Sequence, residues 1–527
     1  MFQFKLYKKA IRLGSFLFVV LCLNINTNAQ DTIAHNLKIL EDFNTDSRSI
    51  PHSYLGKNSK GNYFLFSEGK YAQGSTYFIK TNHDFTEILG KIKLTDYIEG
   101  NETEQLGYFF SREKVYNFSC TENRTVRKFY YQELNLDSFS VNKKILLDSI
   151  HSEKYNIKKS FSAFISNSDT STLGLIYDYH TRSEDTTKFC IISFDQDLVK
   201  VNHHVYSIPK KQRNFIIYSA LIHGKNETYL ITADESKLNL NYKSIPFDID
   251  YHILKLKDGL IDTIAKIDNQ DKWIRQFKFE YYKEKLILTG IYSNHGKFDL
   301  HGTFQFQYNL KEDKLTTLKF KPVNPELFRF HQTSKLNRPL RYMYSKNKVI
   351  KYQELPLYFL NDVYDFEDGS RLLAAEQRLL INSNVDVYVY GNIFLTMLDS
   401  SGNVLWEDII LKNNTKNFTP VYSGYTSIQD SNKIWFVYND NINNLRNIPL
   451  RKRYNAFTPA LNSAIILTEV NSKGLIKQEV IYKNLKLRNK LLRPNPSFEI
   501  GKNKLLLFSQ NKANLKSQKF FILDLNK

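Results

Sequence analysis

The residues best suited to chemistry in this sequence are cations gathered near its carboxyl end. Residues 441–527 hold 17 Lys and Arg against 4 Asp and Glu, and outside this segment and the amino end the chain is nearly balanced. Clustered cations bind anionic polysaccharide, anionic lipid headgroups or the acidic surface of a partner. The candidate binding residues are Arg446, Arg451, Lys452, Arg453, Arg488, Lys490 and Arg493.

Other interpretations of these cations stay open. Lysine-rich loops also keep exposed strand edges soluble without binding any ligand. Nucleic-acid binding would need aromatic stacking or an element that reads a groove, and an exported location argues against it. If the cations do bind, we expect a salt-sensitive contact with an acidic polysaccharide or an envelope protein, and none with nucleic acid.

The acidic residues and histidines show no catalytic or metal-binding spacing. Carboxylates crowd the segment YDFEDGSR, which begins at Tyr364, but their register differs from that of a calcium loop. His203 and His204 are adjacent, and neighbours on a strand point to opposite faces, so they are poorly placed to share a metal ion. The sequence also lacks the His-Glu-x-x-His, Cys-x-x-Cys and Gly-x-Ser-x-Gly patterns. We therefore predict no catalytic residue, no metal site and no cofactor.

The chain contains three cysteines, of which Cys22 lies in an apolar segment near the amino end. Cys120 and Cys190 occupy apolar runs that look alike, where a cysteine is most often a small buried side chain. Two cysteines in so long a chain do not form a disulfide framework. Export would permit a bond between them, and the sequence leaves that bond undecided.

The amino end has the pattern of a secretory signal peptide. Four cations between Lys5 and Arg12 precede a short apolar region at 13–25, and small residues precede a cleavage point after Ala29. We therefore expect residues 1–29 to be removed and the protein to be periplasmic, cell-surface or secreted. The remaining chain has no second apolar stretch long enough to span a bilayer, and we expect a monomer.

The elements that must position the candidate residues are short strands that recur along the chain. Residues 391–412, GNIFLTMLDSSGNVLWEDIILK, serve as a template with an apolar strand, a polar turn and a second apolar strand. Similar hairpins recur at intervals of about fifty to seventy residues, each preceded by another short apolar run. Four strands per unit predict an all-β fold, a β-propeller, because radial stacking of the sheets buries both of their faces.

We expect eight four-stranded blades in a single domain over residues 30–527, with seven blades, or two or three β-sandwiches, as the alternatives. The last unit stops after its third strand. Leu37 and Ile39 alternate with polar neighbours, so this segment is expected to supply the missing outer strand and close the ring. Irregular sequence with several breakers predicts insertion loops near 323–355 and 443–462.

The stretch MLDSSGNVLWEDIIL contains Asp399, Gly402 and Trp406. It resembles the repeat of quinoprotein-type and related bacterial β-propellers, in which an aspartate and a glycine shape the turn and a tryptophan packs between blades. No other unit has a tryptophan at the matching place, whereas quinoprotein dehydrogenases use it in most blades. The resemblance therefore implies the fold and a structural role for these three residues, and it implies no activity.

A propeller pattern without a catalytic motif favours an exported, non-enzymatic binding or scaffold module of the cell envelope. The alternative is a carbohydrate-active hydrolase or lyase that uses acidic residues in the propeller funnel. Two acids facing each other in the funnel, beside exposed aromatic rings, would favour the enzyme.

Overall fold

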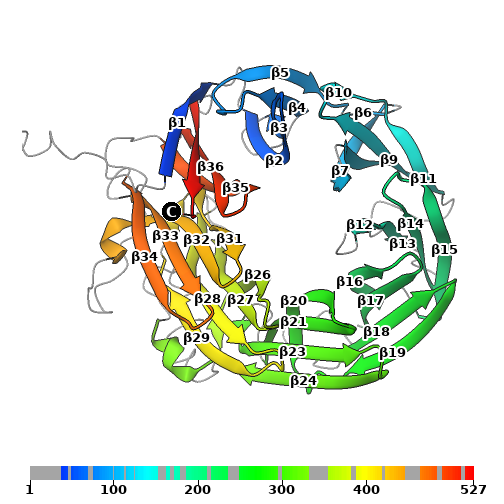
Figure 1. Ribbon diagram of the computed structural model, residues 1–527. Coiled ribbons are helices and arrows are strands. Elements are labelled where there is room, and N and C mark those ends of the chain that lie inside the picture. Colours follow the sequence, from blue (N-terminus) through cyan, green and yellow to red (C-terminus); the bar gives the residue numbers. More distant parts are fainter. Residues whose placement is uncertain are drawn as a thin grey trace, which may run out of the picture.

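The computed structural model is a ring of eight antiparallel sheets, an eight-bladed β-propeller (Figure 1). It confirms the all-β class and the blade count of eight expected from the repeats. The structure describes residues 37–44, 49–68, 75–95, 97–98, 100–111, 114–123, 125–151, 162–166, 171–178, 186–210, 215–234, 249–294, 299–330, 354–381, 387–412, 414–417, 422–445, 463–483, 490–511 and 517–526.

Within each blade the strands follow one another from the centre of the ring outwards. Blade 1 contains β2 (Ser49–Asn58), β3 (Gly61–Glu68), β4 (Thr76–Thr81) and β5 (Ile88–Lys93). Blade 2 contains β7 (Asn101–Ser111), β8 (Lys114–Glu122), β9 (Val126–Asn135) and β11 (Ile145–His151), with the short β6 (Tyr97–Ile98) on β7 and β10 (Ser140–Val141) on β9. Blade 3 contains β12 (Ser162–Ser166), β13 (Leu173–Asp178), β14 (Thr187–Phe194) and β15 (Lys200–Ile208). Blade 4 contains β16 (Phe215–His223), β17 (Glu227–Asp234), β18 (Asp250–Lys257) and β19 (Leu260–Ile267).

The second half of the ring repeats this arrangement. Blade 5 contains β20 (Trp273–Tyr282), β21 (Lys285–Ser293), β23 (Gly302–Asn309) and β24 (Lys314–Pro322). Blade 6 contains β26 (Tyr358–Asp365), β27 (Arg371–Ile381), β28 (Val387–Leu398) and β29 (Val404–Ile410), with β30 (Asn414–Asn417) paired to β28. Blade 7 contains β31 (Thr426–Asp430), β32 (Lys433–Asn441), β33 (Ser463–Asn471) and β34 (Ile476–Lys483). Blade 8 contains β35 (Lys490–Gly501), β36 (Lys504–Asn511), β37 (Ser517–Asp524) and β1 (Leu37–Asn44).

Burial explains why the middle strands read as continuous apolar runs. β3 and β21 are buried along nearly their whole length, because neighbouring blades cover both of their faces. The innermost β20 is half-buried along the channel, and the outermost β5 alternates between half-buried and exposed residues. The template hairpin is formed by β28 and β29, the third and fourth strands of blade 6.

The turn after the third strand carries the most regular sequence feature of the repeat. In seven blades of the described chain an aspartate or asparagine at this position accepts hydrogen bonds from backbone N–H groups of the turn. These residues are Asn82, Asn135, Asp195, Asn309, Asp399, Asn471 and Asp524. The recurring element of the template hairpin is therefore an aspartate or asparagine at the position of Asp399, and its tryptophan is a local addition.

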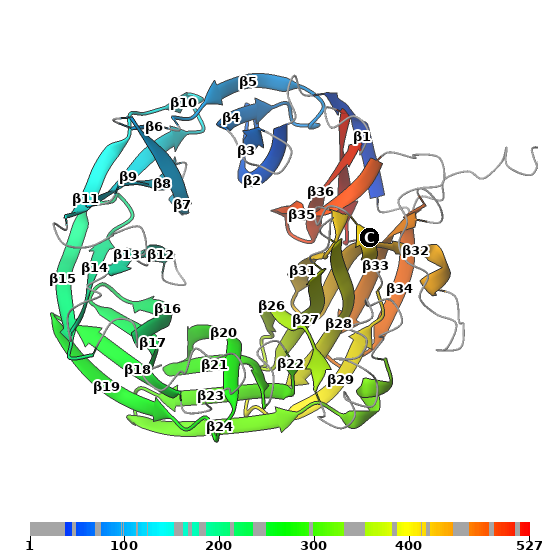
Figure 2. The ribbon, with the colours of Figure 1, turned by 180° about the vertical axis from the view of Figure 1, so that it is seen from behind.

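The ring is closed by the segment that the sequence analysis identified. β1 pairs antiparallel with β37, with Leu37 opposite Leu523 and Ile39 opposite Phe521. Both views of the ribbon place β1 at the outer side of the last blade (Figures 1 and 2). The pairing supplies the fourth strand of blade 8 from the opposite end of the described chain.

The predicted insertions lie largely outside the described residues, since 331–353 and 446–462 are not among them. Their borders hold two short 3-10 helices, η3 (Pro325–Phe330) and η5 (Ile442–Leu445), and β25 (Leu355–Pro356) pairs with β22 (Asp299–Leu300). Residues 1–36, with the predicted signal peptide, also lie outside the described part. No helix within that part has the length and apolar character needed to cross a membrane.

Candidate functional site

The structure describes only a small part of the predicted basic patch. Arg446, Arg451, Lys452, Arg453 and Arg488 lie outside the described residues, and Lys490 is described only in its backbone, at the start of β35. The basic patch therefore remains a prediction.

Arg493 is the member of that group whose side chain is described, and it is buried. Its Nη1 donates a hydrogen bond of 2.7 Å to Gln510 Oε1, and its guanidinium lies 6.0 Å from the centre of the Phe508 ring. Burial lowers the pKa of this guanidinium to about 10. Its side chain packs inside blade 8, so it does not belong to an exposed cationic surface.

Asp399, Gly402 and Trp406 join three neighbouring blades. Asp399 Oδ1 accepts hydrogen bonds from the backbone N–H groups of Ser401 (2.9 Å) and Asn403 (2.8 Å). Gly402 has a φ of +78°, and a Cβ there would meet Gln305 of blade 5 at 2.4 Å. These contacts hold the turn in shape against blade 5.

Trp406 makes the contact of this hairpin with blade 7. Its Nε1 donates a hydrogen bond of 2.9 Å to the backbone oxygen of Ser472. The indole also covers Gly474, where a Cβ would lie 3.0 Å from the ring. In this position the side chain packs between blades 6 and 7.

The carboxylates of the YDFEDGSR segment are used inside the protein. Asp365 forms ion pairs with Lys278 of blade 5 and with Arg371, and Asp368 Oδ1 accepts hydrogen bonds from the backbone and hydroxyl of Ser370. Asp365 therefore contributes to the contact between blades 5 and 6, and Asp368 stabilises the turn before β27.

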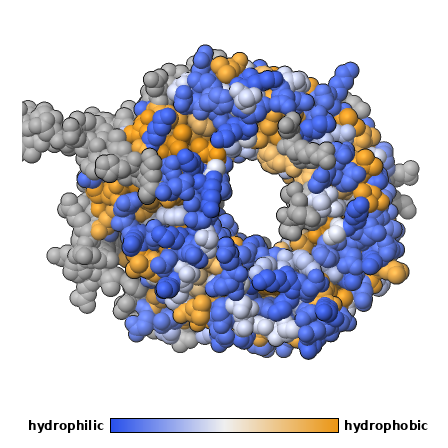
Figure 3. Space-filling model, in the orientation of Figure 1, coloured by the Kyte–Doolittle hydropathy of each residue, from blue (hydrophilic) through white to orange (hydrophobic). Residues whose placement is uncertain are grey.

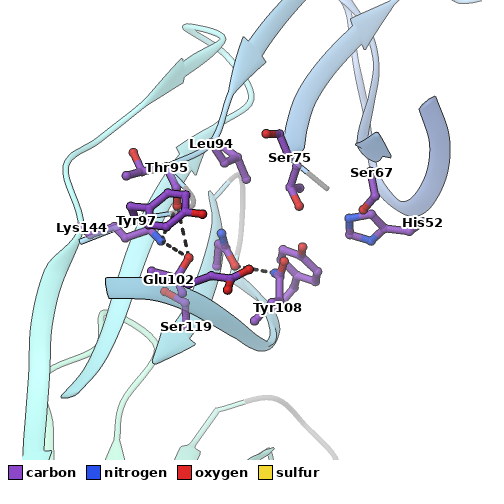
Figure 4. Close-up of a pocket in the computed structure, with 14 residues that line it drawn as sticks. His52, Ser67, Ser75, Leu94, Thr95, Tyr97, Glu102, Tyr108, Ser119 and Lys144 are labelled. Atoms are coloured by element: carbon purple, nitrogen blue, oxygen red, sulfur yellow. Dashed lines mark hydrogen bonds between the residues drawn. The ribbon is translucent and has the colours of Figure 1, made fainter. Parts of the chain in front are cut away.

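A cavity with a volume of about 560 Å³ lies between blades 1 and 2. Its walls come from the first three strands of blade 1, from β6 to β8 of blade 2, and from the connections beside them (Figure 4). Most of the lining side chains are uncharged and can form hydrogen bonds. The lining residues are His52, Ser67, Ser75, Thr76, Leu94, Thr95, Tyr97, Glu102, Thr103, Gln105, Tyr108, Asn117, Ser119 and Lys144.

The innermost strands of the two blades place His52 and Tyr108 in this cavity. Their ring centres lie 5.9 Å apart, His52 on β2 and Tyr108 on β7. Burial lowers the pKa of His52 to about 4, so the imidazole is uncharged at neutral pH. Burial also raises the pKa of the Tyr108 hydroxyl, which the nearby Gln105 side chain partly opposes, so this hydroxyl keeps its proton.

Two hydroxyls of the cavity have no hydrogen-bond partner of standard geometry in the described protein. They are Tyr108 Oη and Ser119 Oγ, both buried atoms. Gln105, which lies near Tyr108, instead donates a hydrogen bond of 2.6 Å to Asn117 Oδ1. Buried polar groups are nearly always paired with protein or water, so these two hydroxyls, on side chains that line the cavity, retain unused hydrogen-bonding capacity.

The described lining contains two charged residues, Lys144, which is held by hydrogen bonds, and Glu102, which is exposed. Lys144 Nζ donates to the backbone oxygen of Thr95 at 2.7 Å and lies 3.4 Å from Thr103 Oγ1, which holds the cation against the wall. Glu102 is exposed, and among the described lining residues it is the sole carboxylate. The described lining thus lacks the carboxylate pair that most glycoside hydrolases use.

This cavity could not be recognised from sequence patterns. Its residues are spread from His52 to Lys144, and none of them belongs to a recognisable motif. The usable signal was the extra hairpin of β6 and β7, which follows the connection from blade 1 and forms part of the wall.

No protein-family model and no curated protein matches the sequence. Among solved structures, the β-propeller domain of the Trilobed protease from Pyrococcus furiosus is similar, with 10% identity, coverage of 85% of this chain and 97% of that chain, and a TM-score of 0.33. An oligogalacturonate lyase in complex with manganese matches with 10% identity, coverage of 92% and 99%, and a TM-score of 0.37. The polysaccharide lyase Uly1 matches with 10% identity, coverage of 82% and 94%, and a TM-score of 0.33.

Likenesses at this level carry no conclusion about what the chain binds or does. The sheet topology and the absence of a matching family model together describe the chain as a divergent eight-bladed β-propeller.

Proposed function

We propose that this protein is an exported, non-enzymatic binding module whose cavity between blades 1 and 2 takes up an uncharged polyhydroxylated ligand, such as a neutral carbohydrate segment. The observation that carries the proposal is the pair of unpartnered buried hydroxyls, Tyr108 Oη and Ser119 Oγ, in a cavity of about 560 Å³. A ligand hydroxyl can both donate to and accept from such groups. The volume lies within the usual range of small-molecule sites.

The electrostatics of the cavity support an uncharged ligand. The imidazole of His52 is neutral at physiological pH, and the ammonium of Lys144 is already held by protein oxygens. Tyr97 and Tyr108 add aromatic surface to the lining, which suits the apolar face of a sugar ring. A neutral ligand also predicts binding that changes little with salt, unlike the salt-sensitive contact expected of the basic patch.

The test is a glycan-binding screen with the purified mature protein at two salt concentrations, followed by calorimetry on the best ligand. Tyr108→Phe and Ser119→Ala are each expected to weaken binding about tenfold, because each removes one hydrogen bond to the ligand. Tyr281→Phe is the matched control, since Tyr281 also lies beside a histidine of a neighbouring blade, with ring centres 4.1 Å apart from His223. Equal affinity of the Tyr108 and Ser119 variants and the unaltered protein would reject the cavity as the binding site.

A carbohydrate-active lyase or hydrolase is the second candidate, and one observation favours it. The uncharged His52 imidazole and the protonated Tyr108 hydroxyl line the same cavity, as a proton-transfer pair would. Incubation of a bound polysaccharide with the protein, read out as new reducing ends and unsaturated products, distinguishes the two. Turnover that His52→Gln abolishes would replace the binding module with the enzyme.

The exported location is tested separately, by fractionation of cells that produce the full chain or a chain without residues 1–29. We expect the full chain outside the cytoplasm and the shortened chain inside it. Retention of the full chain in the cytoplasm would overturn this part of the proposal.

A further inference from the structure

Three side chains of different ligand chemistry meet between blades 2 and 3, away from the cavity. They are Asp148 on β11, Cys190 on β14 and His203 on β15. One oxygen, the sulfur and one ring nitrogen of this group all lie within 4.8 Å of one another. Cys190 is buried, Asp148 is half-buried and His203 is exposed at the outer edge of the ring.

Strand register explains why these residues meet. In the β14–β15 pair His203 lies opposite Ile192, and Cys190 lies opposite Val205, so Cys190 and His203 share one face of blade 3. That face packs on blade 2, because Cys190 and Ile192 belong to the same core cluster as Phe129 of β9. Asp148 lies opposite Phe129 and therefore points at the same interface from blade 2.

The adjacent histidine lies on the other side of the sheet. His204 is opposite Ile191, and its ring approaches Gly259 of blade 4, where a Cβ would lie 3.3 Å from Nδ1. Adjacent strand residues thus point to opposite faces: His204 faces blade 4, and His203 faces Asp148 of blade 2.

A fourth side chain orients the carboxylate. The Tyr177 hydroxyl donates a hydrogen bond of 2.7 Å to Asp148 Oδ2, and Tyr177 lies directly opposite Cys190 in the β13–β14 pair. Hydrogen bonds of this kind to a ligating carboxylate fix its direction and are typical of built metal sites.

We propose that Asp148, Cys190 and His203 bind one divalent transition-metal ion, with Zn²⁺ as the best match, across the interface of blades 2 and 3. Thiolate, imidazole and carboxylate are the donor types that Zn²⁺ takes in tetrahedral sites. Bonds of about 2.0–2.3 Å place tetrahedral ligand atoms about 3.3–3.8 Å apart, so the longest separation must shorten by about 1 Å. His203 is exposed on the outermost strand of its blade, so its side chain can rotate to adjust its distance from the other two ligands.

The charges and protons of this site balance. On binding, the Cys190 thiol loses one proton to solvent and becomes a thiolate, while the neutral imidazole of His203 contributes a lone pair. The thiolate and the Asp148 carboxylate together carry two negative charges, which neutralise the divalent ion inside the interface. A water molecule would complete the four-coordinate site.

The experiment uses the metal-free mature protein, titrated with Zn²⁺ against a chromophoric chelator and separately with Co²⁺. We expect one ion per chain, and for Co²⁺ an absorption band from thiolate-to-metal charge transfer. Cys190→Ser and His203→Ala are each expected to weaken Zn²⁺ binding by more than about 100-fold, and Tyr177→Phe by about 10-fold, as for outer partners of a ligand. His203 is exposed, so its alanine variant keeps the fold even if Cys190→Ser does not.

Two matched controls separate this site from adventitious binding. His204→Ala alters the neighbouring histidine, and Cys120→Ser alters the other buried thiol, which lies in the preceding blade. Both are expected to bind Zn²⁺ within about threefold of the unaltered protein. The proposal is overturned if the metal-free protein binds no Zn²⁺, if His203→Ala binds as well as the unaltered protein, or if His204→Ala loses as much affinity as His203→Ala.

Discussion

The interface between blades 1 and 2 and the interface between blades 6 and 7 differ in whether their buried polar groups are paired. Between blades 1 and 2, two buried hydroxyls on cavity-lining side chains have no hydrogen-bond partner of standard geometry in the described protein. Between blades 6 and 7, Glu376 and Lys412 are completely buried and paired, and Lys412 Nζ also donates to the backbone oxygen of Gly424 at 3.1 Å. Arg378 Nε lies 3.1 Å from the same carboxylate.

The tyrosines of the two interfaces show the same contrast. The Tyr364 hydroxyl donates to Asp362 Oδ2 at 3.1 Å and lies 2.6 Å from Ser427 Oγ of blade 7. The Tyr108 hydroxyl has no partner of standard geometry among the described residues, although Gln105 lies near it. Both interfaces use the same sheet geometry, so the difference lies in which side chains the neighbouring blade supplies. A network in which every polar group is hydrogen-bonded joins two blades, whereas one with unpaired groups leaves hydrogen-bonding capacity for a ligand. Figure 3 shows the open centre of the ring that all the blades surround.

The largest expected effect is that of Lys412→Met. It leaves the buried Glu376 carboxylate with only its Arg378 and Asn361 contacts, and we expect the free energy of unfolding to fall by about 3 kcal/mol. Urea denaturation measures it. Lys433→Met in blade 7, which breaks a half-exposed ion pair with Glu469, is the control and should cost less than about 1 kcal/mol. Similar losses in both variants would mean that the interface of blades 6 and 7 does not depend on its buried pair.

Trp406→Ala is expected to cost about 2–3 kcal/mol, because it removes the indole from Gly474 and the hydrogen bond to Ser472. Leu405→Ala, at the exposed neighbouring position on the same strand, should change stability by less than about 0.5 kcal/mol. Thermal melting of both variants checks the difference. Equal melting temperatures of the two variants would show that Trp406 does not stabilise the contact between blades 6 and 7.

Tyr364→Phe and Tyr108→Phe compare the two interfaces directly with one chemical change. The first leaves the Asp362 carboxylate with one hydrogen bond fewer and should cost about 2 kcal/mol. The second removes a hydroxyl that has no partner and should change the unfolding free energy by less than about 0.5 kcal/mol. Urea midpoints of the two variants measure both. A large loss in Tyr108→Phe would show that the cavity hydroxyl is already satisfied within the protein.

The smallest effect is a pH dependence from His52. Its pKa is lowered to about 4 in the folded protein, so between pH 6.5 and 4 the unfolded chain binds a proton that the folded chain does not. Stability should therefore fall by about 1–2 kcal/mol as the pH drops from 7.5 to 5.5, and this part of the loss should vanish in His52→Gln. Unfolding curves at pH 7.5, 5.5 and 4.5 provide the measurement. An identical pH profile in both proteins would place His52 in contact with water.

Much of the architecture was predictable because it depends on local patterns. The continuous apolar runs indicated strands buried on both faces, and the polar turns divided the chain into units. Leu37 and Ile39 indicated the closing strand because alternation on a single strand is visible without knowing its partner. Trp406 could be assigned an interblade position from the resemblance of its hairpin, whereas Arg493 gave no sign in sequence that it would be buried.

The sequence by itself determined that the chain forms short strands in eight repeated units, since strand periodicity and turn chemistry act within a few residues. Only the tertiary structure decided which polar groups are satisfied. Tyr108 and Tyr364 are the same residue type on equivalent inner strands, but blade 7 supplies the Ser427 hydroxyl to Tyr364, and the described part of the chain supplies no partner of standard geometry to Tyr108. Asp148 and His203 likewise lie 55 positions apart in the chain and meet because radial stacking brings neighbouring sheets face to face. Sites formed between blades therefore depend on contacts that no local pattern encodes.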